Sequence, residues 1–226
     1  MAKSEREIAA ALRRAALFRA LAPATLAGVA ATATVLTVPR GNHLCRRGER
    51  WPGFYQVVSG RVMLSVGAPH GVSKVIGLVG PGRNFGLAAA LHGVPETITA
   101  ETLADSTLVL IPREALLEGI ARDARFGEQL LAALSREVCG LIADIEAISL
   151  HSGRARVADY LLQLADSART QAITLPAKKS IIASRLNLTP EYFSRMLHEL
   201  IAAKAIAVNG RQITVLDPAR LRRRDA

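Results

Sequence analysis

The alternation of apolar and polar positions divides the chain into three regimes. Residues 4–31 place apolar side chains at helical spacing, broken by Pro23, and predict helix. Residues 34–112 hold short β-rich runs separated by glycine-containing turns, at intervals of roughly 8–12 residues. Such a series predicts antiparallel strands in a β-sandwich or small barrel. From residue 113 to residue 150 the spacing is helical again and predicts a long helical stretch.

The later part of this long helix carries an apolar seam. Its residues are separated by alternating steps of three and four, as in a coiled coil: Leu131, Leu134, Val138, Leu141, Ile145 and Ile148. Leu130 and Ile142 fall on a neighbouring face, which is free to pack against the β-rich part. The alternative is one helix with two apolar faces inside a single domain. We expect instead that the seam joins two copies of the chain in a homodimer.

A helix-turn-helix is predicted near the C-terminus. Residues 178–186 form a short apolar helix, and Asn187 and Leu188 form the turn. Thr189 and Pro190 are suited to begin a second helix, which runs to about residue 203. The stretch AIAVNGRQITVL then predicts a hairpin whose two-residue loop is Asn-Gly, which fits the wing of a winged helix.

Polar side chains gather at the start of the second helix, away from its apolar face. Glu191, Ser194 and Arg195 are predicted base contacts, because Arg can grip guanine and Glu can accept a hydrogen bond from cytosine. The predicted phosphate contacts are Lys178, Lys179, Ser180, Thr189, Tyr192 and Arg211. The alternative is a surface ion pair between Glu191 and Arg195, and both interpretations can hold at once.

The charge distribution favours a nucleic-acid partner. The net charge is +10, and residues 151–226 hold 13 Lys and Arg against 6 Asp and Glu. With 50% hydrophobic and 21% charged residues, the chain is expected to fold into compact domains. The N-terminal residues show neither a secretory signal nor a membrane span, so we expect a cytoplasmic protein without a membrane partner. No phosphate loop, nucleophile elbow or dinucleotide fingerprint occurs, and we expect no enzyme.

The chain resembles the cyclic-AMP receptor protein/FNR (CRP/FNR) family of bacterial transcription regulators. The resemblance rests on PRGNHLCRRGERWPGFYQVVSGRVMLSV, VGPGRNFG and ADSTLVLIPREAL in the β-rich part, and on RVADYLLQLA and LTPEYFSRML in the C-terminal part. It implies an α+β fold with a sensory, cyclic-nucleotide-binding-like β-barrel (jelly roll) and N-terminal helices in residues 1–112. A dimerisation helix (113–150) and a winged helix-turn-helix DNA-binding domain (151–226) follow. Double-stranded DNA and RNA polymerase are the implied partners.

Finer features resemble one branch of that family. The pattern Glu191-x-x-Ser194-Arg195 resembles the FNR branch, which implies a palindrome like TTGAT-N4-ATCAA. The stretches DIEAISL and PEYFSRMLHEL resemble the Dnr-type regulators of denitrification, proposed sensors of nitric oxide that use haem. The alternatives are an effector-independent or redox-responsive regulator, and a regulatory module on the same barrel that does not bind DNA.

The segment expected to hold the effector departs from the family pattern. Leu87 stands where a cyclic-nucleotide pocket needs glutamate, and no arginine lies between Arg83 and Arg113 to meet a phosphate. We therefore expect no binding of a cyclic nucleotide. The two cysteines, Cys45 and Cys139, cannot supply the four thiolates of an iron–sulfur cluster.

Since neither a cyclic nucleotide nor an iron–sulfur cluster is expected, haem is the remaining candidate cofactor. Its candidate axial ligands are His43, His70, His92, His151, His198 and Cys45. His92 is singled out because it follows the apolar stretch FGLAAAL, which suits a flat hydrophobic ligand but equally suits core packing. The candidate effector pocket is Phe85, Gly86, Leu87 and His92.

Overall fold

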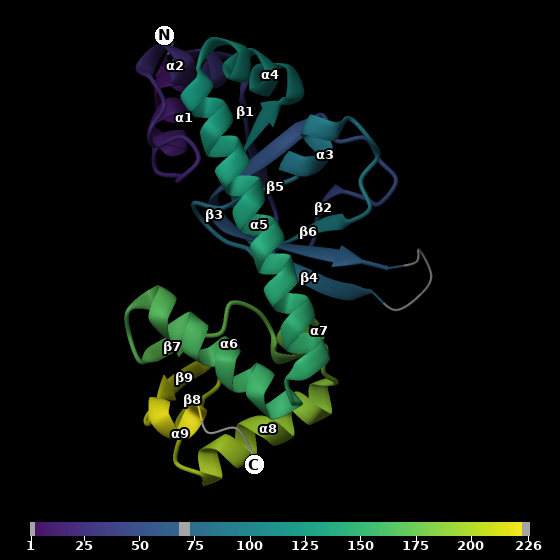
Figure 1. Cartoon of the computed structure of the whole chain (residues 1–226), viewed down its shortest axis with the longest axis vertical. Helices are drawn as coiled ribbons and strands as arrows, with labels where there is room; N and C mark the ends of the chain where they lie inside the picture. Colours follow the sequence, from purple (N-terminus) through teal and green to yellow (C-terminus); the bar gives the residue numbers. More distant parts are fainter. Residues whose placement is uncertain (1–2, 68–72, 223–226) are drawn as a thin grey trace. The chain divides into compact units, whose positions relative to one another are not determined.

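The computed structural model describes residues 3–67 and 73–222. The chain divides into two compact units, Met1–Cys139 and Gly140–Ala226, and the boundary falls within the long helix α5 (Ala124–Leu150; Figure 1). The fold is the predicted α+β arrangement: a β-sheet domain, the long helix, and a helix-turn-helix domain with a small sheet.

An antiparallel sheet forms the centre of the first unit. Its strands are β1 (Thr34–Val38), β2 (His43–Cys45), β3 (Gly53–Val66), β4 (Lys74–Val79), β5 (Asn84–Phe85) and β6 (Thr99–Pro112). The order is β1-β6-β3-β4, with β2 paired to β6 and β5 paired to β3. These strands fall within residues 34–112, where the sequence predicted them. The interval also holds a short helix, α3 (Leu87–His92), which the sequence analysis did not predict.

The two longest strands, β3 and β6, bend where their register shifts. The shifts lie between Val57 and Val62, and each extra residue increases local twist and turns the strand. Gly60 sits within this stretch at φ +85°, and a Cβ there would lie 2.2 Å from the Ser106 hydroxyl. Only glycine fits both the backbone conformation and this close approach. Successive residues of both strands contribute to two separate cores, because side chains of a strand alternate between the faces of a sheet.

The first core joins the helices of this unit to the sheet. Phe18 lies between Phe54 and Phe126, at 6.0 Å between ring centroids in both contacts. These rings come from the segment between α1 and α2, from β3 and from the start of α5. Leu130, which the sequence placed on the face free to pack against the β-rich part, is buried in this core, whereas Ile142 stays exposed. A second core, which includes Trp51, Tyr55 and Phe85, lies inside the sheet.

The N-terminal helical region forms two helices, α1 (Lys3–Arg13) and α2 (Pro23–Thr32), joined by turns. Pro23 is the first residue of α2, where its missing N–H leaves no hydrogen bond unmade. The helical region is thus interrupted before Pro23 as expected, but α1 ends at Arg13, so residues 14–22, which the sequence predicted as helix, form turns instead.

The long helix predicted over residues 113–150 is two helices, α4 (Arg113–Arg122) and α5. Asp123 separates them with an extended backbone at φ −143° and ψ 101°. Its carboxylate accepts hydrogen bonds from the Arg125 N–H at 3.0 Å and from the Thr25 hydroxyl at 3.1 Å. An aspartate that satisfies the first N–H groups of α5 stabilises a new helix start, so α4 ends before it.

The second unit holds the predicted helix-turn-helix. Its helices are α6 (Gly153–Ala168), α7 (Lys179–Arg185), α8 (Pro190–Ala202) and α9 (Pro218–Arg222), and its strands are β7 (Ala172–Thr174), β8 (Ile206–Asn209) and β9 (Gln212–Val215). Helices α7 and α8 end within about one residue of the predicted limits. The strand order is β7-β9-β8, and β7 and α9 were not predicted.

The predicted hairpin exists, but its loop is displaced by one residue. Asn209 pairs with Gln212, so the two loop residues are Gly210 and Arg211 rather than Asn209 and Gly210. Gly210 adopts φ +60°, the conformation that a tight hairpin loop requires. The sequence thus correctly predicted that Gly210 lies in the loop. It placed Gly210 second in the loop, whereas Gly210 is the first of the two loop residues.

Candidate nucleic-acid interface and sensory core

The turn between α7 and α8 is fixed by backbone hydrogen bonds and one left-handed residue. Asn187 adopts φ +57°, which asparagine tolerates better than most side chains. The Leu188 N–H then donates to the Ala183 carbonyl at 2.9 Å. Ile182 of α7 and Phe193 of α8 are fully buried in this domain. The turn and the packing together determine the angle at which α8 leaves α7.

The start of α8 is capped as the sequence predicted. The Thr189 hydroxyl accepts a hydrogen bond from the Tyr192 N–H at 3.2 Å, and Pro190 occupies the first turn. Glu191 and Arg195 are exposed, and Ser194 is half-buried. The three predicted base contacts therefore lie within the first two turns of α8, on residues that the buried face does not use.

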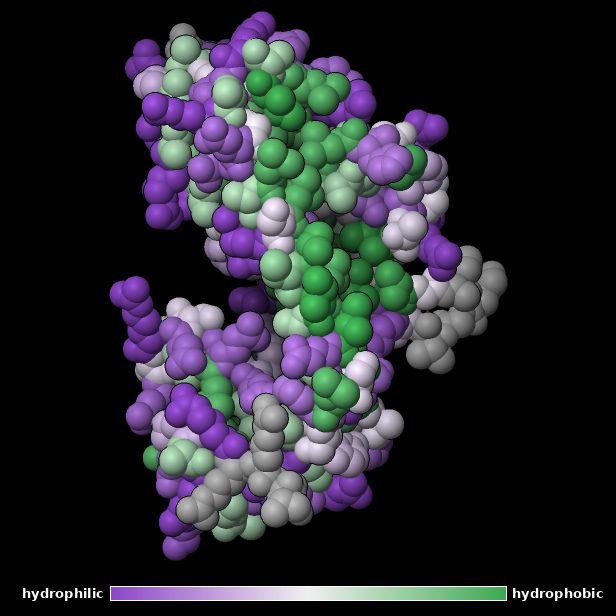
Figure 2. All heavy atoms as spheres, in the orientation of Figure 1, coloured by the Kyte–Doolittle hydropathy of each residue, from purple (hydrophilic) through white to green (hydrophobic). Residues whose placement is uncertain are grey.

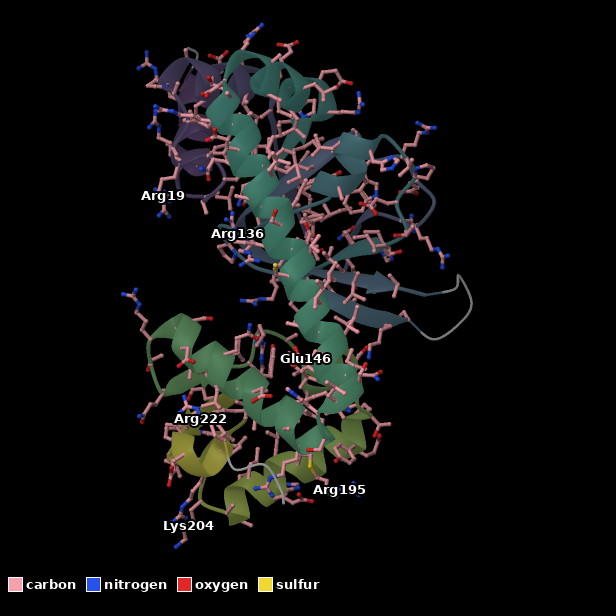
Figure 3. The ribbon with its side chains drawn as sticks, in the orientation of Figure 1. Arg19, Arg136, Glu146, Arg195, Lys204 and Arg222 are labelled. Carbon is pink, nitrogen blue, oxygen red and sulfur yellow. The ribbon has the colours of Figure 1, made fainter. Side chains whose placement is uncertain are left out.

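Arg195 is exposed but has two neighbours that restrict it. Its side chain is 64% exposed, and its guanidinium carbon lies 4.7 Å from the centre of the Tyr192 ring (Figure 3). Its Nε lies 3.9 Å from a carboxylate oxygen of Glu199. The i,i+4 ion pair of Arg195 is thus formed with Glu199, and not with Glu191 as the sequence suggested.

The Tyr192 ring is held against the first residue of α6. A Cβ on Gly153 would lie 2.4 Å from the ring, so no larger residue leaves Tyr192 in place. Tyr192 therefore lies between Gly153 and the guanidinium of Arg195. Neither local pattern nor composition marks Gly153, and the sequence analysis did not identify it.

The predicted phosphate contacts occupy the edges of this surface. Lys178 and Ser180 are exposed and Lys179 is half-buried, all at the start of α7. Arg211 lies in the hairpin loop, and its guanidinium donates to the Leu175 carbonyl at 2.6 Å. The Leu175 N–H in turn donates to the Arg211 carbonyl at 2.9 Å. Arg211 thus anchors the hairpin to the segment after β7, a role that the sequence did not predict.

The seam of α5 is exposed in a single chain. Leu131, Val138, Leu141, Ile145 and Ile148 are 67%, 55%, 51%, 64% and 39% exposed. Figure 2 shows apolar residues following the course of α5. Leu134 differs, because it is half-buried and packs against the first core. Soluble proteins rarely leave so long an apolar stripe in water, and such stripes mark interaction surfaces.

Aromatic rings fill the second core, inside the sheet. The rings of Tyr55 and Phe85 stack at 5.1 Å, and Trp51 meets them edge-on at 5.9 and 5.8 Å. The Cys45 thiol and the Tyr55 hydroxyl form a hydrogen bond of 3.4 Å beside them. Two of these residues belong to β3 and β5, which pair directly. The indole N–H of Trp51 is buried without a hydrogen-bond partner.

Burial controls the acid–base behaviour of this core. Loss of hydration raises the pKa of the Cys45 thiol to about 11; its hydrogen bond with Tyr55 lowers it in part, and Glu49 and Glu96 raise it further. Burial likewise raises the pKa of the Tyr55 hydroxyl. The pKa of Glu96 is also raised by burial, against hydrogen bonds from the N–H groups of Thr97 and Ile98. The carboxylate of Glu137 on α5 adds to this effect.

The candidate effector residues do not share one environment. Phe85 is buried in the aromatic core, whereas Leu87 is buried in the first core with the helices. Gly86, between them, adopts φ +82° and lies against the Trp51 ring. His92, at the end of α3, is exposed.

The other candidate haem ligands are dispersed. His43 and His198 are exposed, and the His151 ring lies 3.3 Å from the Asp159 carboxylate. Cys45 holds its proton, and His70 lies outside the described residues. Within residues 3–67 and 73–222, no group of three or more His, Cys, Asp and Glu is placed to hold a metal ion. Over the same residues, no helix has the length and apolar character needed to cross a membrane.

Two family models match separate parts of the chain. One, described as a cyclic nucleotide-binding domain, matches residues 35–123. The other, described as a Crp-like helix-turn-helix domain, matches residues 155–224. The first spans the sheet with α3 and α4, and the second spans most of α6 and all of α7 and α8.

Individual relatives match nearly the whole chain. A CRP-like cAMP-activated global transcriptional regulator of Mycobacterium tuberculosis is 28% identical over 218 residues, which is 94% of this chain and 97% of the relative. The structure of FixK2 from Bradyrhizobium japonicum is 26% identical, with a TM-score of 0.77 over 84% of this chain and 95% of that one. DNR from Pseudomonas aeruginosa is 29% identical, with a TM-score of 0.51 over 98% and 97%. These identities of 26–29% are too similar to one another to single out the Dnr branch.

The environments of the two cysteines predict different reactivities. Cys139 on α5 is exposed, whereas Cys45 is buried and hydrogen-bonded. With a pKa of about 11, only about one Cys45 in a thousand is a thiolate at pH 8. We expect Ellman's reagent to react quickly with one thiol per native chain and with the second only after unfolding in urea. Cys139→Ser should remove the fast phase alone; a fast phase that persists in this variant would contradict the assignment.

Proposed function

Because the chain belongs to the CRP/FNR family of DNA-binding transcription regulators, we propose that it acts as a homodimer on a palindrome resembling TTGAT-N4-ATCAA. The family is not enzymatic, as the sequence led us to expect. The observation that carries the proposal is the group of Glu191, Ser194 and Arg195 at the capped start of α8. The N-terminal part of a recognition helix is the part that meets base edges in the major groove.

Each of the three side chains suits one feature of this half-site. Arg195 can donate two hydrogen bonds to guanine O6 and N7, and Glu191 can accept one from the N4 amine of cytosine. Ser194 is small and can either donate or accept. Tyr192 restricts the guanidinium of Arg195 before binding, which lowers the conformational entropy lost when the complex forms.

Phosphate contacts from both edges of this surface position α8 in the groove. We assign them to Lys178, Lys179, Ser180, Thr189, Tyr192 and Arg211. Lys178 and Lys179 begin α7, and Arg211 is in the hairpin loop, the wing of the domain. Contacts of this kind add affinity without reading sequence, so they leave specificity to α8.

Two copies of the chain pair through the seam of α5. Each exposed leucine, isoleucine or valine that becomes buried contributes roughly 1.5–3 kcal/mol. A two-fold axis along α5 relates two recognition helices, and a palindrome with half-sites about 34 Å apart has the same symmetry. The family implies RNA polymerase as the further partner and the cytoplasm as the compartment.

The N-terminal domain carries the effector site, and its chemistry disfavours a cyclic nucleotide. The buried Leu87 cannot bond a ribose hydroxyl. No arginine lies between Arg83 and Arg113 to meet a phosphate, and this segment instead carries Glu96, whose pKa is raised by burial and by Glu137. A phosphate without a cationic partner is costly in a partly buried site. The effector is therefore of another chemical class.

Haem-based sensing of nitric oxide stays a prediction of the sequence, without support from the described residues. The described histidines are exposed, or lie beside a carboxylate as His151 does, and the Cys45 thiol is protonated and bonded to Tyr55. These residues do not fit a haem site, and we derive no step of the mechanism from haem. The link to denitrification depends on the same sensing and is not part of the proposal.

Charge placed in the seam should separate the dimer. Leu141→Glu with Ile145→Glu should give monomers that bind the palindrome at least tenfold more weakly, because buried carboxylates would face each other. Leu134 is unsuitable for this test because it packs against the first core. The measurements are sedimentation velocity and fluorescence anisotropy.

Ala143→Glu is the control, because it places one carboxylate, against two in the double variant, at an exposed position on the opposite side of α5. It should remain a dimer with unchanged affinity. If the variant with both Leu141→Glu and Ile145→Glu still sediments as a dimer, the seam is not the dimer interface.

Replacement of Arg195 should change specificity. Arg195→Ala should cost ~1–3 kcal/mol per half-site and remove discrimination at the guanine, because the bidentate contact is lost. Glu191→Ala should broaden specificity with a smaller loss of affinity. Anisotropy against every single-base variant of one half-site measures both effects.

Lys178→Ala serves as the comparison. It should weaken binding to all sequences alike and reduce the salt dependence by about one unit of slope. If Arg195→Ala binds the base variants in the same ratio as the wild type, α8 does not read the guanine.

Cyclic AMP and cyclic GMP should not bind, because Leu87 stands where the pocket needs glutamate and no arginine lies between Arg83 and Arg113 to meet a phosphate. Isothermal titration should show no saturable heat with either nucleotide up to about 1 mM, a concentration that corresponds to roughly 4 kcal/mol of binding free energy. Titration of the same sample with the palindromic duplex shows that the protein is active. A micromolar affinity for either nucleotide would overturn this assignment of the pocket.

A further inference from the structure

An ion pair joins α5 to the helix that precedes the recognition helix. Arg185 Nη2 donates to Asp144 Oδ2 at 2.6 Å, across 41 positions of the sequence. The two side chains are only 25% and 36% exposed, and both belong to the second unit. Bonds of this length between a guanidinium and a carboxylate are among the stronger hydrogen bonds in proteins.

Arg185 and Asp144 each lie next to an element that takes part in the proposed DNA recognition or dimerisation. Arg185 is the last residue of α7, directly before the turn that leads to α8. Asp144 lies one residue before Ile145 and three after Leu141, among the last residues of the exposed seam of α5. The pair therefore connects the end of α7 to the part of α5 where two chains would meet.

The chain reaches α7 from α5 only through α6 and β7. His151 and Ser152 join α5 to α6: the Ser152 hydroxyl accepts from the Ala155 N–H at 3.2 Å to begin α6, and the His151 ring lies 3.3 Å from the Asp159 carboxylate of α6. These contacts hold α6, whereas a direct attachment of α7 to α5 needs a contact between those two helices. The ion pair supplies such a contact.

We propose that Asp144 and Arg185 form a positioning contact, which holds α7 and α8 at the angle that the paired seams of α5 set. This inference rests on the proposed dimer and its palindrome. The contact does not touch DNA. It acts by fixing the separation and orientation of two recognition helices, so its loss changes the spacing of half-sites that the dimer accepts.

Removal of the Asp144 charge distinguishes two explanations, because they predict opposite changes in the affinity for DNA. Asp144→Asn takes a negative charge away from a DNA-binding protein, which by electrostatics alone should tighten binding to a polyanion. If the contact positions α7, the same variant should instead bind the palindrome about fivefold more weakly. Glu146→Gln is the matched control, since Glu146 is exposed and lies on the same helix two residues away (Figure 3). It should bind as the wild type or slightly more tightly.

The second measurement is the preferred spacing between half-sites. A general loss of protein stability would lower affinity for every spacing and leave that preference unchanged. The wild type should prefer a four-base spacer to three- and five-base spacers, and Asp144→Asn should lose most of that preference. Binding is measured by anisotropy, with sedimentation and thermal unfolding to establish that the variant is a folded dimer. Equal behaviour of Asp144→Asn and Glu146→Gln, or weaker binding with unchanged spacing preference, would overturn the inference.

Arg185 gives the second arm: Arg185→Gln alone is the test if Asp144→Asn does not fold, and the double variant is compared where it does. Arg185→Gln should weaken binding and flatten the spacing preference in the wild type, yet add little to Asp144→Asn, because the contact is already lost. An equal effect in both backgrounds would mean that Arg185 meets DNA directly, contrary to the proposal. Failure of the wild type itself to bind the palindrome is a distinct result, which rejects the proposed function.

Discussion

Along α5, the side chains of Val138, Leu141 and Ile145 face water in a single chain, although they repeat at the spacing of a packed interface. In the homodimer that we propose, a second copy buries this seam and sets a two-fold axis. The proposed reading of a palindrome by α8 depends on that axis, because one five-base half-site offers too few contacts for specific binding and two related half-sites offer twice as many. The Asp144–Arg185 bond places the end of α7 on the same turns of α5 as the seam. Asp144 and Arg185 thereby connect the proposed dimer interface to the start of the recognition helix.

The N-terminal domain retains the sheet of a nucleotide-binding domain but has different chemistry at its centre. The three rings of Trp51, Tyr55 and Phe85 contact one another and fill this core. The Cys45 thiol and the Tyr55 hydroxyl bond each other, and both stay neutral at physiological pH because burial raises their pKa values. The carboxylates of Glu49 and Glu96 raise the pKa of the Cys45 thiol further. This chemistry is one reason that we propose an effector other than a cyclic nucleotide.

The sequence predicted features that depend on local spacing, and missed those that depend on contacts between distant residues. The strand region, the seam, the cap at Thr189 and the two helices of the helix-turn-helix each have a signal within a few residues. The break at Asp123 had a signal too, since aspartate is a preferred N-cap, but the helical spacing on both sides obscured it. The Asp144–Arg185 pair and the approach of Tyr192 to Gly153 join residues 41 and 39 positions apart, and no local pattern marks them. The partial burial of Leu134 likewise follows from the first core and not from the seam.

The composition of the complex with DNA tests the central claim, that two chains joined through α5 read one palindrome. Native mass spectrometry of the wild type, with and without a duplex carrying TTGAT-N4-ATCAA, measures it directly. The expected species without DNA has twice the 24.1 kDa mass of one chain, and the complex contains that dimer and one duplex. A duplex in which one half-site is scrambled should bind far more weakly with the same stoichiometry. A monomer without DNA, or one chain bound per intact palindrome, would contradict the claim.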